Sequence, residues 1–355
     1  MKLDVIKQGN SVDVLKTFPD ESIDCCITSP PYYGLRDYGM EDQIGLEETP
    51  EAYIQRLVDV FHEVKRVLKK DGTLWLNIAD SYWGSGSRGY DFTGKMSEAS
   101  KLQSNSKGTI NLSRIPKLVG NTTTGIKNKD LIGIPWMLAF ALRTDGWYLR
   151  QDIIWHKPNP MPESVTDRCT KSHEYIFLLS KNSSYYFDYE SIEEAANIQN
   201  VSDHIKFGGN KYGDNDSEKY AIYSGNEYKP KTKNCKYDGQ RPNTMHLNRE
   251  KGQQDKEYLV RRKRDVWSVN VQPTKEAHFA TFPENLIKPC VLAGCRVGGV
   301  ILDPFFGSGT TGRVALHLNR HYIGIELNPE YIDIAHNRTN NVQMSLVGLI
   351  EGVKV

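Results

Sequence analysis

A proline-rich turn, Ser29-Pro30-Pro31-Tyr32, follows directly on an apolar, strand-like run that ends at Thr28. Two consecutive prolines end a strand and hold their neighbours in extended or turn geometry. The turn therefore presents a hydroxyl, backbone carbonyls and an aromatic ring at the end of a strand, where open α/β sheets bind ligands. A rigid pair of hydrogen-bond acceptors beside a flat ring is suited to holding the amino group of a planar heterocycle.

Two other interpretations of this turn stay open at this point. Pro-Pro-Tyr also occurs as a ligand for a WW-type groove and as a purely structural turn. Such ligands lie in disordered, proline-rich tracts, whereas this turn abuts a buried-looking strand, so the ligand interpretation is disfavoured. The four residues alone do not exclude a structural turn, and the second half of the chain has to decide.

A second chemical motif lies near the C-terminal end of the chain. The apolar run Val300–Leu302 leads into Asp303-Pro304-Phe305-Phe306-Gly307-Ser308-Gly309-Thr310, then a helical pattern, then a strand ending at Glu326. Glycines let the backbone approach a ligand closely, and an acid at the end of the next strand accepts both ribose hydroxyls of a nucleotide. Together with Gly312, Gly307 and Gly309 also have the glycine spacing of a Rossmann dehydrogenase.

The acid that precedes the loop separates these two interpretations. A carboxylate is repelled by pyrophosphate but attracted to the positive charge of a sulfonium-bearing amino acid. Asp303 therefore favours S-adenosylmethionine over a dinucleotide.

Alternating strand and helix patterns surround both motifs. This alternation predicts a doubly wound, mostly parallel sheet of the α/β class. Asp71-Gly72 is expected to end the first long helix. Strands are expected at Leu3–Ile6, Ile23–Thr28, Thr73–Ile78, Trp147–Trp155, Tyr175–Leu179, Val300–Leu302 and Tyr322–Ile325, and helices at Pro50–Lys70, Ile134–Arg143, Glu284–Leu292, Thr311–Leu318 and from Pro329 to about Thr339.

The composition of the 355 residues, with 38% hydrophobic and 25% charged, is ordinary for a soluble globular protein. No apolar run approaches the roughly 20 residues that span a bilayer, and the N-terminus lacks the apolar core of a signal peptide. The six cysteines show no zinc-finger spacing, and the adjacent Cys25 and Cys26 are expected on opposite faces of one strand. We expect a cytoplasmic protein with free thiols, no metal site and no membrane association.

The net charge of +1 conceals an uneven distribution of charge. The segment from His204 to Arg264 holds 15 Lys and Arg against 8 Asp and Glu, and the segment from Gly84 to Asp130 holds 8 against 3. Both segments lack sustained periodicity and exceed ordinary connection lengths of about 4–6 residues. Two basic insertions in an otherwise acidic chain favour a polyanionic partner, although lysine-rich loops are also common as plain solvated surface.

Several segments together resemble the amino-methylating family of site-specific DNA methyltransferases, which act on N4 of cytosine or N6 of adenine. They are TSPPYYGLRDYG (Thr28–Gly39), WHKPNPMPES (Trp155–Ser164), RDVW (Arg264–Trp267), HFATFP (His278–Pro283), LDPFFGSGTTG (Leu302–Gly312) and IELNPEYIDIA (Ile325–Ala335). The likeness covers almost everything outside the two insertions. The catalytic turn precedes the cofactor loop, which resembles the circularly permuted β class.

The resemblance implies a fold and a division of the chain. The sheet would have seven largely parallel strands with an antiparallel edge strand, and helices on both faces. Residues 1–194 would form the catalytic half of the methyltransferase domain, with the basic loop 84–130 inserted. Residues 195–263 would form the target-recognition segment, and residues 264–355 the cofactor-binding half.

The resemblance also implies roles for particular residues. Ser29 and the Pro30 carbonyl would accept hydrogen bonds from the target amino group, with Pro31 completing the turn and Tyr32 stacking on the flipped base. Asn10 stands where relatives often have Asp. S-adenosylmethionine would be bound by Asn10, Phe279, Thr281, Asp303, Phe305, Gly307, Gly309, Thr310 and Glu326. Phosphate contacts with double-stranded DNA are expected from Arg261, Arg262, Lys263 and Arg264.

The target base and the partners are less determined by sequence. Ser at the first position of the turn is commoner among N4-cytosine enzymes and Asp among N6-adenine enzymes, so cytosine is favoured and adenine is the alternative. A cognate restriction endonuclease is compatible with the resemblance, as are a monomer and a homodimer. An RNA or protein-glutamine methyltransferase usually has the two motifs in the reverse order, and a DNA-binding module with a decayed site disagrees with the intact cofactor loop.

Overall fold

The computed structural model describes residues 1–84, 125–195, 260–272, 282–340 and 342, and every structural statement below concerns these residues. The chain divides into two compact units. One comprises Met1–Ile192 with Arg264–Val355, and the other comprises Glu193–Lys263. In the second unit, β6 (Glu194–Ala195) pairs with β7 (Val260–Arg261) in an antiparallel ladder.

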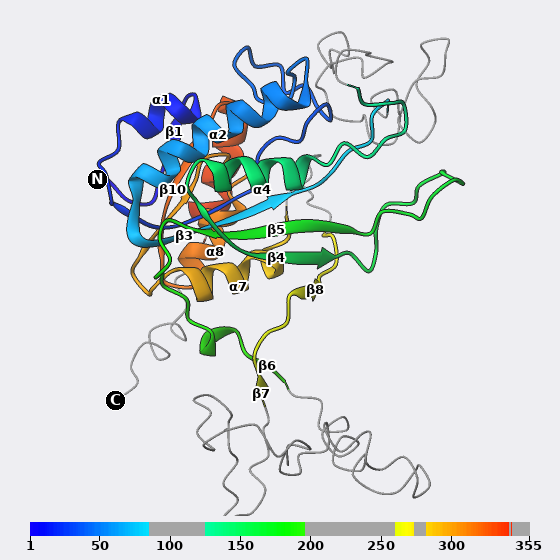
Figure 1. Ribbon diagram of the computed structural model, residues 1–355. Helices are drawn as coiled ribbons and strands as arrows, with labels where there is room; N and C mark the ends of the chain where they lie inside the picture. Colours follow the sequence, from blue (N-terminus) through cyan, green and yellow to red (C-terminus); the bar gives the residue numbers. More distant parts are fainter. Residues whose placement is uncertain (85–124, 196–259, 273–281, 341, 343–355) are drawn as a thin grey trace, which may run out of the picture. The chain divides into compact units, whose positions relative to one another are not determined.

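The first unit is built on an eight-stranded sheet with the order β1-β10-β9-β2-β3-β5-β4-β8 (Figure 1). Neighbouring strands run parallel except at β5, which is antiparallel to both β3 and β4. The strands are β1 (Val5–Gln8), β2 (Ile23–Thr28), β3 (Leu68–Ile78), β4 (Tyr148–His156), β5 (His173–Ser180), β8 (Val266–Ser268), β9 (Val300–Asp303) and β10 (His321–Glu326).

Helices cover both faces of the sheet. The helices are α1 (Ser11–Lys16), α2 (Pro50–Val67), α4 (Ile134–Thr144), α7 (Glu284–Gly294), α8 (Thr310–His317) and α9 (Pro329–Asn340), with a 3₁₀ turn, η2, at Glu190–Ile192. One core cluster packs α1, α2 and α4 on the sheet, and a second packs α7, α8 and α9 (Figure 1). Cys26 belongs to the first cluster and Cys25 to the second, which confirms that they lie on opposite faces.

Local sequence signals explain where the helices begin. Thr49 caps α2, since its side chain accepts a hydrogen bond from the Ala52 amide, and Pro50 occupies the first helical turn, where its missing N–H has no cost. Pro329 has the corresponding place in α9. The short α1, which the periodicity did not predict, is capped by the Asn10 side chain.

The α/β class and the mostly parallel sheet are confirmed, but three details differ from expectation. The sheet has eight strands rather than seven, because β8 adds three residues beside β4. The antiparallel strand β5 lies inside the sheet, between β3 and β4, rather than at its edge. The helix α2 ends at Val67, and Asp71-Gly72 lies within β3, where the pairing with β2 shifts register and a Cβ on Gly72 would crowd the Asp24 carbonyl.

Phe306, in the cofactor-loop motif, depends on two glycines for its place. Its buried ring stacks on Tyr322 with the centroids 5.3 Å apart, and a Cβ on Gly324 or Gly312 would overlap the ring. Both glycines therefore provide space that no side chain can share with Phe306.

Gly324→Ala is expected to lower the free energy of unfolding by about 1–3 kcal/mol, since the ring has to move within a packed core. Denaturant unfolding followed by circular dichroism measures this change. Val297→Ala, which shortens an exposed side chain, serves as the control and is expected to change stability by less than about 0.5 kcal/mol. Wild-type stability of Gly324→Ala would show that the ring is not confined there.

Candidate active site

The glycine-rich turn between β9 and α8 adopts backbone conformations that favour glycine. Gly307 has φ of +51° and Gly309 has φ of +81°. A Cβ on Gly309 would lie 3.0 Å from the Ala335 Cβ, so this position has neither the conformation nor the space for another residue. The turn thereby brings its backbone to the carboxyl end of β9, where a ligand can approach it closely.

Glu326, at the carboxyl end of β10, is hydrogen-bonded to the backbone of this turn. Its Oε2 accepts a hydrogen bond from the Gly307 amide and its Oε1 from the Asn328 amide, both at 2.8 Å. Burial raises the pKa of the Glu326 carboxyl, and the backbone donors partly offset this effect. Each carboxylate oxygen has a further lone pair, so Glu326 retains capacity to accept hydrogen bonds from a ligand in the cleft.

Asp303 connects the two sequence motifs. Its buried carboxylate accepts hydrogen bonds from the Thr28 and Thr311 hydroxyls, both at 2.6 Å, and from the Phe305 amide at 3.0 Å. Burial raises the pKa of Asp303 to about 6, although these three donors oppose the increase. Thr28 directly precedes the proline turn, so the carboxylate holds the ends of β2 and β9 together.

The proline turn is itself held in place from behind. The Tyr53 hydroxyl donates to the Pro31 carbonyl at 2.7 Å, and the Gly34 amide donates to the Gly45 carbonyl at 2.8 Å. Within the described residues, no donor reaches the Pro30 carbonyl. The Pro30 carbonyl is therefore available as an acceptor beside the half-buried Ser29, and its role toward a base stays a prediction.

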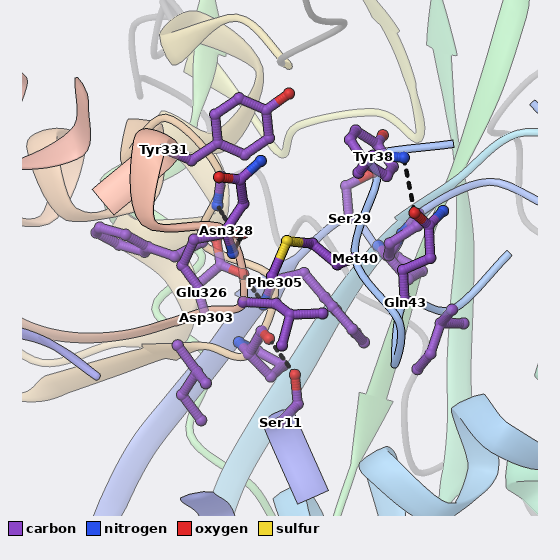
Figure 2. A pocket seen from close by; sticks show the side chains of 18 of the residues that line it. Ser11, Ser29, Tyr38, Met40, Gln43, Asp303, Phe305, Glu326, Asn328 and Tyr331 are labelled. Atoms are coloured by element: carbon purple, nitrogen blue, oxygen red, sulfur yellow. Dashed lines mark hydrogen bonds between the residues drawn. The ribbon is translucent and has the colours of Figure 1, made fainter. Parts of the chain in front are cut away.

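Both motifs line one cleft, which contains about 1300 Å³ of empty space that is partly open to solvent. Figure 2 shows Glu326, Asn328 and Tyr331 on one side and Ser29, Tyr38 and Gln43 on the other, with the Met40 side chain between them. The predicted site residues found in this cleft are Asn10, Ser29, Pro30, Pro31, Tyr32, Asp303, Phe305, Gly307, Thr310 and Glu326.

Of the remaining predicted cofactor residues, Gly309 is described and does not line this cleft; it lies against Ala335 of α9. Phe279 and Thr281 lie outside the described residues, although the neighbouring Phe282 lines the cleft. Asn10 lies in the cleft with its Oδ1 engaged in capping α1, so its Nδ2 is the atom left to meet a ligand.

The predicted DNA-binding run extends over both units. In the second unit, Arg261 forms an ion pair with Glu194 at 3.0 Å, which links β7 to β6, and Arg262 is exposed. In the first unit, Arg264 is exposed, and its carbonyl accepts a hydrogen bond from the Trp267 indole. A role for these residues and Lys263 in DNA binding stays a prediction.

Sequence reasoning missed a wall of the cleft formed by the loop after the proline turn. Gln43 fixes this loop, because its side chain accepts from the Tyr38 amide and donates to the Arg36 carbonyl. The Tyr38 ring meets Tyr331 of α9 edge to face, with centroids 6.2 Å apart. The aromatic and polar side chains of TSPPYYGLRDYG carried this signal, and Asn328-Pro329 marked the helix that presents Tyr331.

A sheet of this order, with a glycine turn after one strand and an acid ending the next, defines a nucleotide-type site of the α/β class. A family model described as DNA methylase, of the N6/N4 type, matches residues 23–337. The chain therefore belongs to the N4/N6 family of DNA methyltransferases, as its motifs predicted. This family uses S-adenosylmethionine as its methyl donor, which confirms the expected cofactor.

Individual relatives agree with this assignment over nearly the whole chain. Type II methyltransferase M.Cfr9I of Citrobacter freundii is 42% identical over 340 residues, which cover 96% of this chain and 89% of the relative. Type II methyltransferase M.SmaI of Serratia marcescens is 44% identical over 330 residues, which cover 93% and 88%.

Two solved structures share the fold. PvuII DNA methyltransferase (cytosine-N4-specific) is 16% identical with a TM-score of 0.57, over 97% of this chain and 89% of that one. The protein TTHA0409 of Thermus thermophilus, complexed with S-adenosyl-L-methionine, is 19% identical with a TM-score of 0.50, over 96% of this chain and 98% of that one. Among the described helices, none is long and apolar enough to cross a membrane.

The cleft fits S-adenosylmethionine chemically. The turn at Gly307 leaves room for close backbone approach, Glu326 has spare acceptor capacity for ribose hydroxyls, and Phe305 and Tyr331 supply apolar surface for a purine ring. Asp303 also lines the cleft, and its carboxylate holds the turn through its protein donors; its predicted contact with the cofactor stays a prediction.

The raised pKa of Asp303 has a consequence for stability. The unfolded carboxyl titrates near its ordinary value of about 4 and the folded one at about 6, so the folded state binds the proton more tightly between these values. The free energy of unfolding of the wild type should therefore fall, by about 2 kcal/mol from this group, as the pH rises from about 4 to about 6.

Asp303→Asn removes this titration and is expected to lose that part of the pH dependence, whatever its constant offset in stability. Urea unfolding at several pH values between 4 and 7 measures the difference, with Asp333→Asn at an exposed position of α9 as the control. A constant difference between Asp303→Asn and wild type across this range would contradict the raised pKa.

Proposed function

We propose that this DNA methyltransferase acts at specific sites of double-stranded DNA and methylates the exocyclic N4 of cytosine. The observation that carries the proposal is the position of Ser29 and the Pro30 carbonyl, as paired acceptors, in the same cleft as the glycine turn and Glu326. Ser at the first position of the turn favours cytosine. The structural neighbour PvuII DNA methyltransferase is cytosine-N4-specific, which favours the same base. Methylation of adenine N6 by the same mechanism is the second candidate.

The chain's residues have defined tasks in this mechanism. Bound S-adenosylmethionine supplies an electrophilic methyl group on a sulfonium. The exocyclic amine of a base is a poor nucleophile, because its lone pair is delocalised into the ring. Ser29 Oγ and the Pro30 carbonyl each accept a hydrogen bond from the amino group. These two bonds favour a tetrahedral nitrogen whose lone pair points toward the methyl group. Positioning of this kind supplies much of the acceleration.

Other parts of the chain bring the base to the cleft. The base leaves the duplex before it can reach Ser29, and the Tyr32 ring, which lines the cleft, offsets part of the unstacking cost. Residues 195–263, which belong to the second unit, read the DNA sequence in this proposal, and the basic run at Arg261–Arg264 contacts phosphates. The cofactor site is proposed to be formed by Asn10, Phe279, Thr281, Asp303, Phe305, Gly307, Gly309, Thr310 and Glu326.

The base is identified by expressing the protein in a host without DNA methylation and analysing nucleosides of the host DNA by mass spectrometry. N4-methylcytosine is the expected product. N6-methyladenine would replace the first candidate by the second. Unmodified DNA from a host that contains cofactor-binding protein would contradict both, and sequencing-based motif detection in the same DNA gives the recognition sequence.

Ser29→Ala tests the role of the turn separately. We expect it to retain S-adenosylmethionine affinity within about two-fold, because Ser29 contacts the base in this mechanism, and to lose methyl transfer by about 10²–10³-fold. Equilibrium dialysis measures the affinity, and transfer of tritiated methyl groups to unmethylated DNA measures the rate. A rate near that of wild type would refute the role of Ser29 as an acceptor.

A further inference from the structure

A buried polar cluster lies directly behind the catalytic turn. It joins Ser29 and Tyr32 of the turn to Asn77 of β3, Glu174 of β5 and Lys157, which follows β4. Asn77 and Glu174 are 4% and 8% exposed. Glu174 lies near the beginning of β5, and Asn77 lies near the end of β3. Because the two strands are antiparallel, both residues lie at the same end of the strand pair, and Asn77 pairs with Ile176.

The Glu174 carboxylate is the acceptor in each of its side-chain hydrogen bonds within the described residues. The Tyr32 hydroxyl donates to Oε2 at 2.7 Å, Asn77 Nδ2 donates to the same oxygen at 3.1 Å, and the Lys157 ammonium donates to Oε1. A carboxylate has no hydrogen to donate in return. Glu174 therefore acts only as an acceptor within the cluster.

The orientation of Asn77 agrees with this direction. Its Nδ2 faces oxygens of Glu174, Tyr32 and Ser29, at 3.1, 3.0 and 3.4 Å, while its buried Oδ1 has no hydrogen-bond partner in the described part of the chain. The reversed amide would set its oxygen against these acceptors. Asn77 thus adds a second donor aimed at Glu174 and Tyr32.

The direction of these bonds determines where the Ser29 hydrogen goes. Since the Tyr32 hydrogen is committed to Glu174, the Tyr32 oxygen is an acceptor toward Ser29, whose Oγ lies 3.4 Å away. Burial raises the pKa of Tyr32 well above its ordinary value, as does the neighbouring Glu174, so the phenol keeps the hydrogen that it donates. The hydrogen bonds then run from Ser29 to Tyr32 to Glu174.

We propose that Glu174 is a positioning residue that draws the Ser29 hydrogen toward Tyr32, so that Ser29 Oγ presents lone pairs to the target amino group. The inference rests on the proposed function and deepens it. A carboxylate at the first position of the turn would be an acceptor by nature, but a serine hydroxyl has a hydrogen that must point elsewhere. A Ser29 hydrogen pointing into the cleft would meet an amino hydrogen of the base and repel it.

Glu174→Gln tests the proposal, because it keeps the shape of the side chain but introduces an amide donor. The single-turnover rate with tritiated S-adenosylmethionine and unmethylated DNA is expected to fall about 10–100-fold. The dissociation constant for S-adenosylmethionine should stay within about two-fold. Tyr32→Phe, which keeps the ring but interrupts the chain of hydroxyls, is expected to lose about 10-fold. Glu63→Gln, which alters the Glu63–Arg66 ion pair on α2, is the control and should turn over like wild type.

Non-additivity separates this role from a merely structural one. When Glu174→Gln is added to Tyr32→Phe, the single-turnover rate is expected to fall by less than about 3-fold below that of Tyr32→Phe alone. The hydrogen-bonded chain is already broken in Tyr32→Phe, so little remains to be lost. Independent, multiplying losses, or a wild-type rate for Glu174→Gln, would overturn the inference while leaving the methyltransferase assignment intact. Failure of the wild type to methylate DNA would overturn the proposed function and this inference together. If Glu174→Gln does not fold, the single variant Tyr32→Phe decides, and a wild-type rate there overturns the inference.

Discussion

One buried carboxylate holds the active cleft together. Asp303 ends β9 and accepts hydrogen bonds from Thr28, at the end of β2, and from Thr311, in the first turn of α8. Burying a carboxylate is costly, and the raised pKa of Asp303 shows that its donors offset this cost only in part. In return, a single group fixes the last residue before the proline turn and the helix that follows the glycine turn. Parallel pairing of β2 with β9, at Cys25 with Ile301, supports the same junction.

The antiparallel strand β5 adds a second constraint at the same edge of the sheet. In an all-parallel sheet, only the carboxyl ends of strands reach this edge, whereas β5 begins there. Glu174, near that beginning, can therefore lie behind the turn and accept from Tyr32. The cleft combines two environments: hydrogen-bonded backbone amides around Glu326 on one side, and on the other the Tyr32 hydroxyl, which donates to Glu174 beside Ser29.

Much of this arrangement is encoded locally and could be predicted from the sequence. The proline pair at Pro30-Pro31 ends a strand, the glycines at 307 and 309 adopt left-handed conformations, and Asn328-Pro329 starts a helix, each through the chemistry of a few adjacent residues. Both sequence motifs line the same cleft.

What the sequence did not reveal depends on partners distant in the chain. Asp71-Gly72 is a common helix ending, but pairing with β2 extends β3 through it. Asn77 and Glu174 lie in apolar strands without any motif of their own, and only the packing of β3 against β5 brings them to Tyr32. Tyr331 lines the cleft because Tyr38 packs on it from the other half of the chain.

The claim that both ends of the chain form one cofactor cleft is tested most directly by hydrogen–deuterium exchange of the protein with and without S-adenosylmethionine. We predict that the cofactor slows exchange both in peptides that cover Tyr32–Gln43 and in peptides that cover Phe305–Asn328. Protection confined to Phe305–Asn328, with exchange in Tyr32–Gln43 unchanged, would contradict the claim.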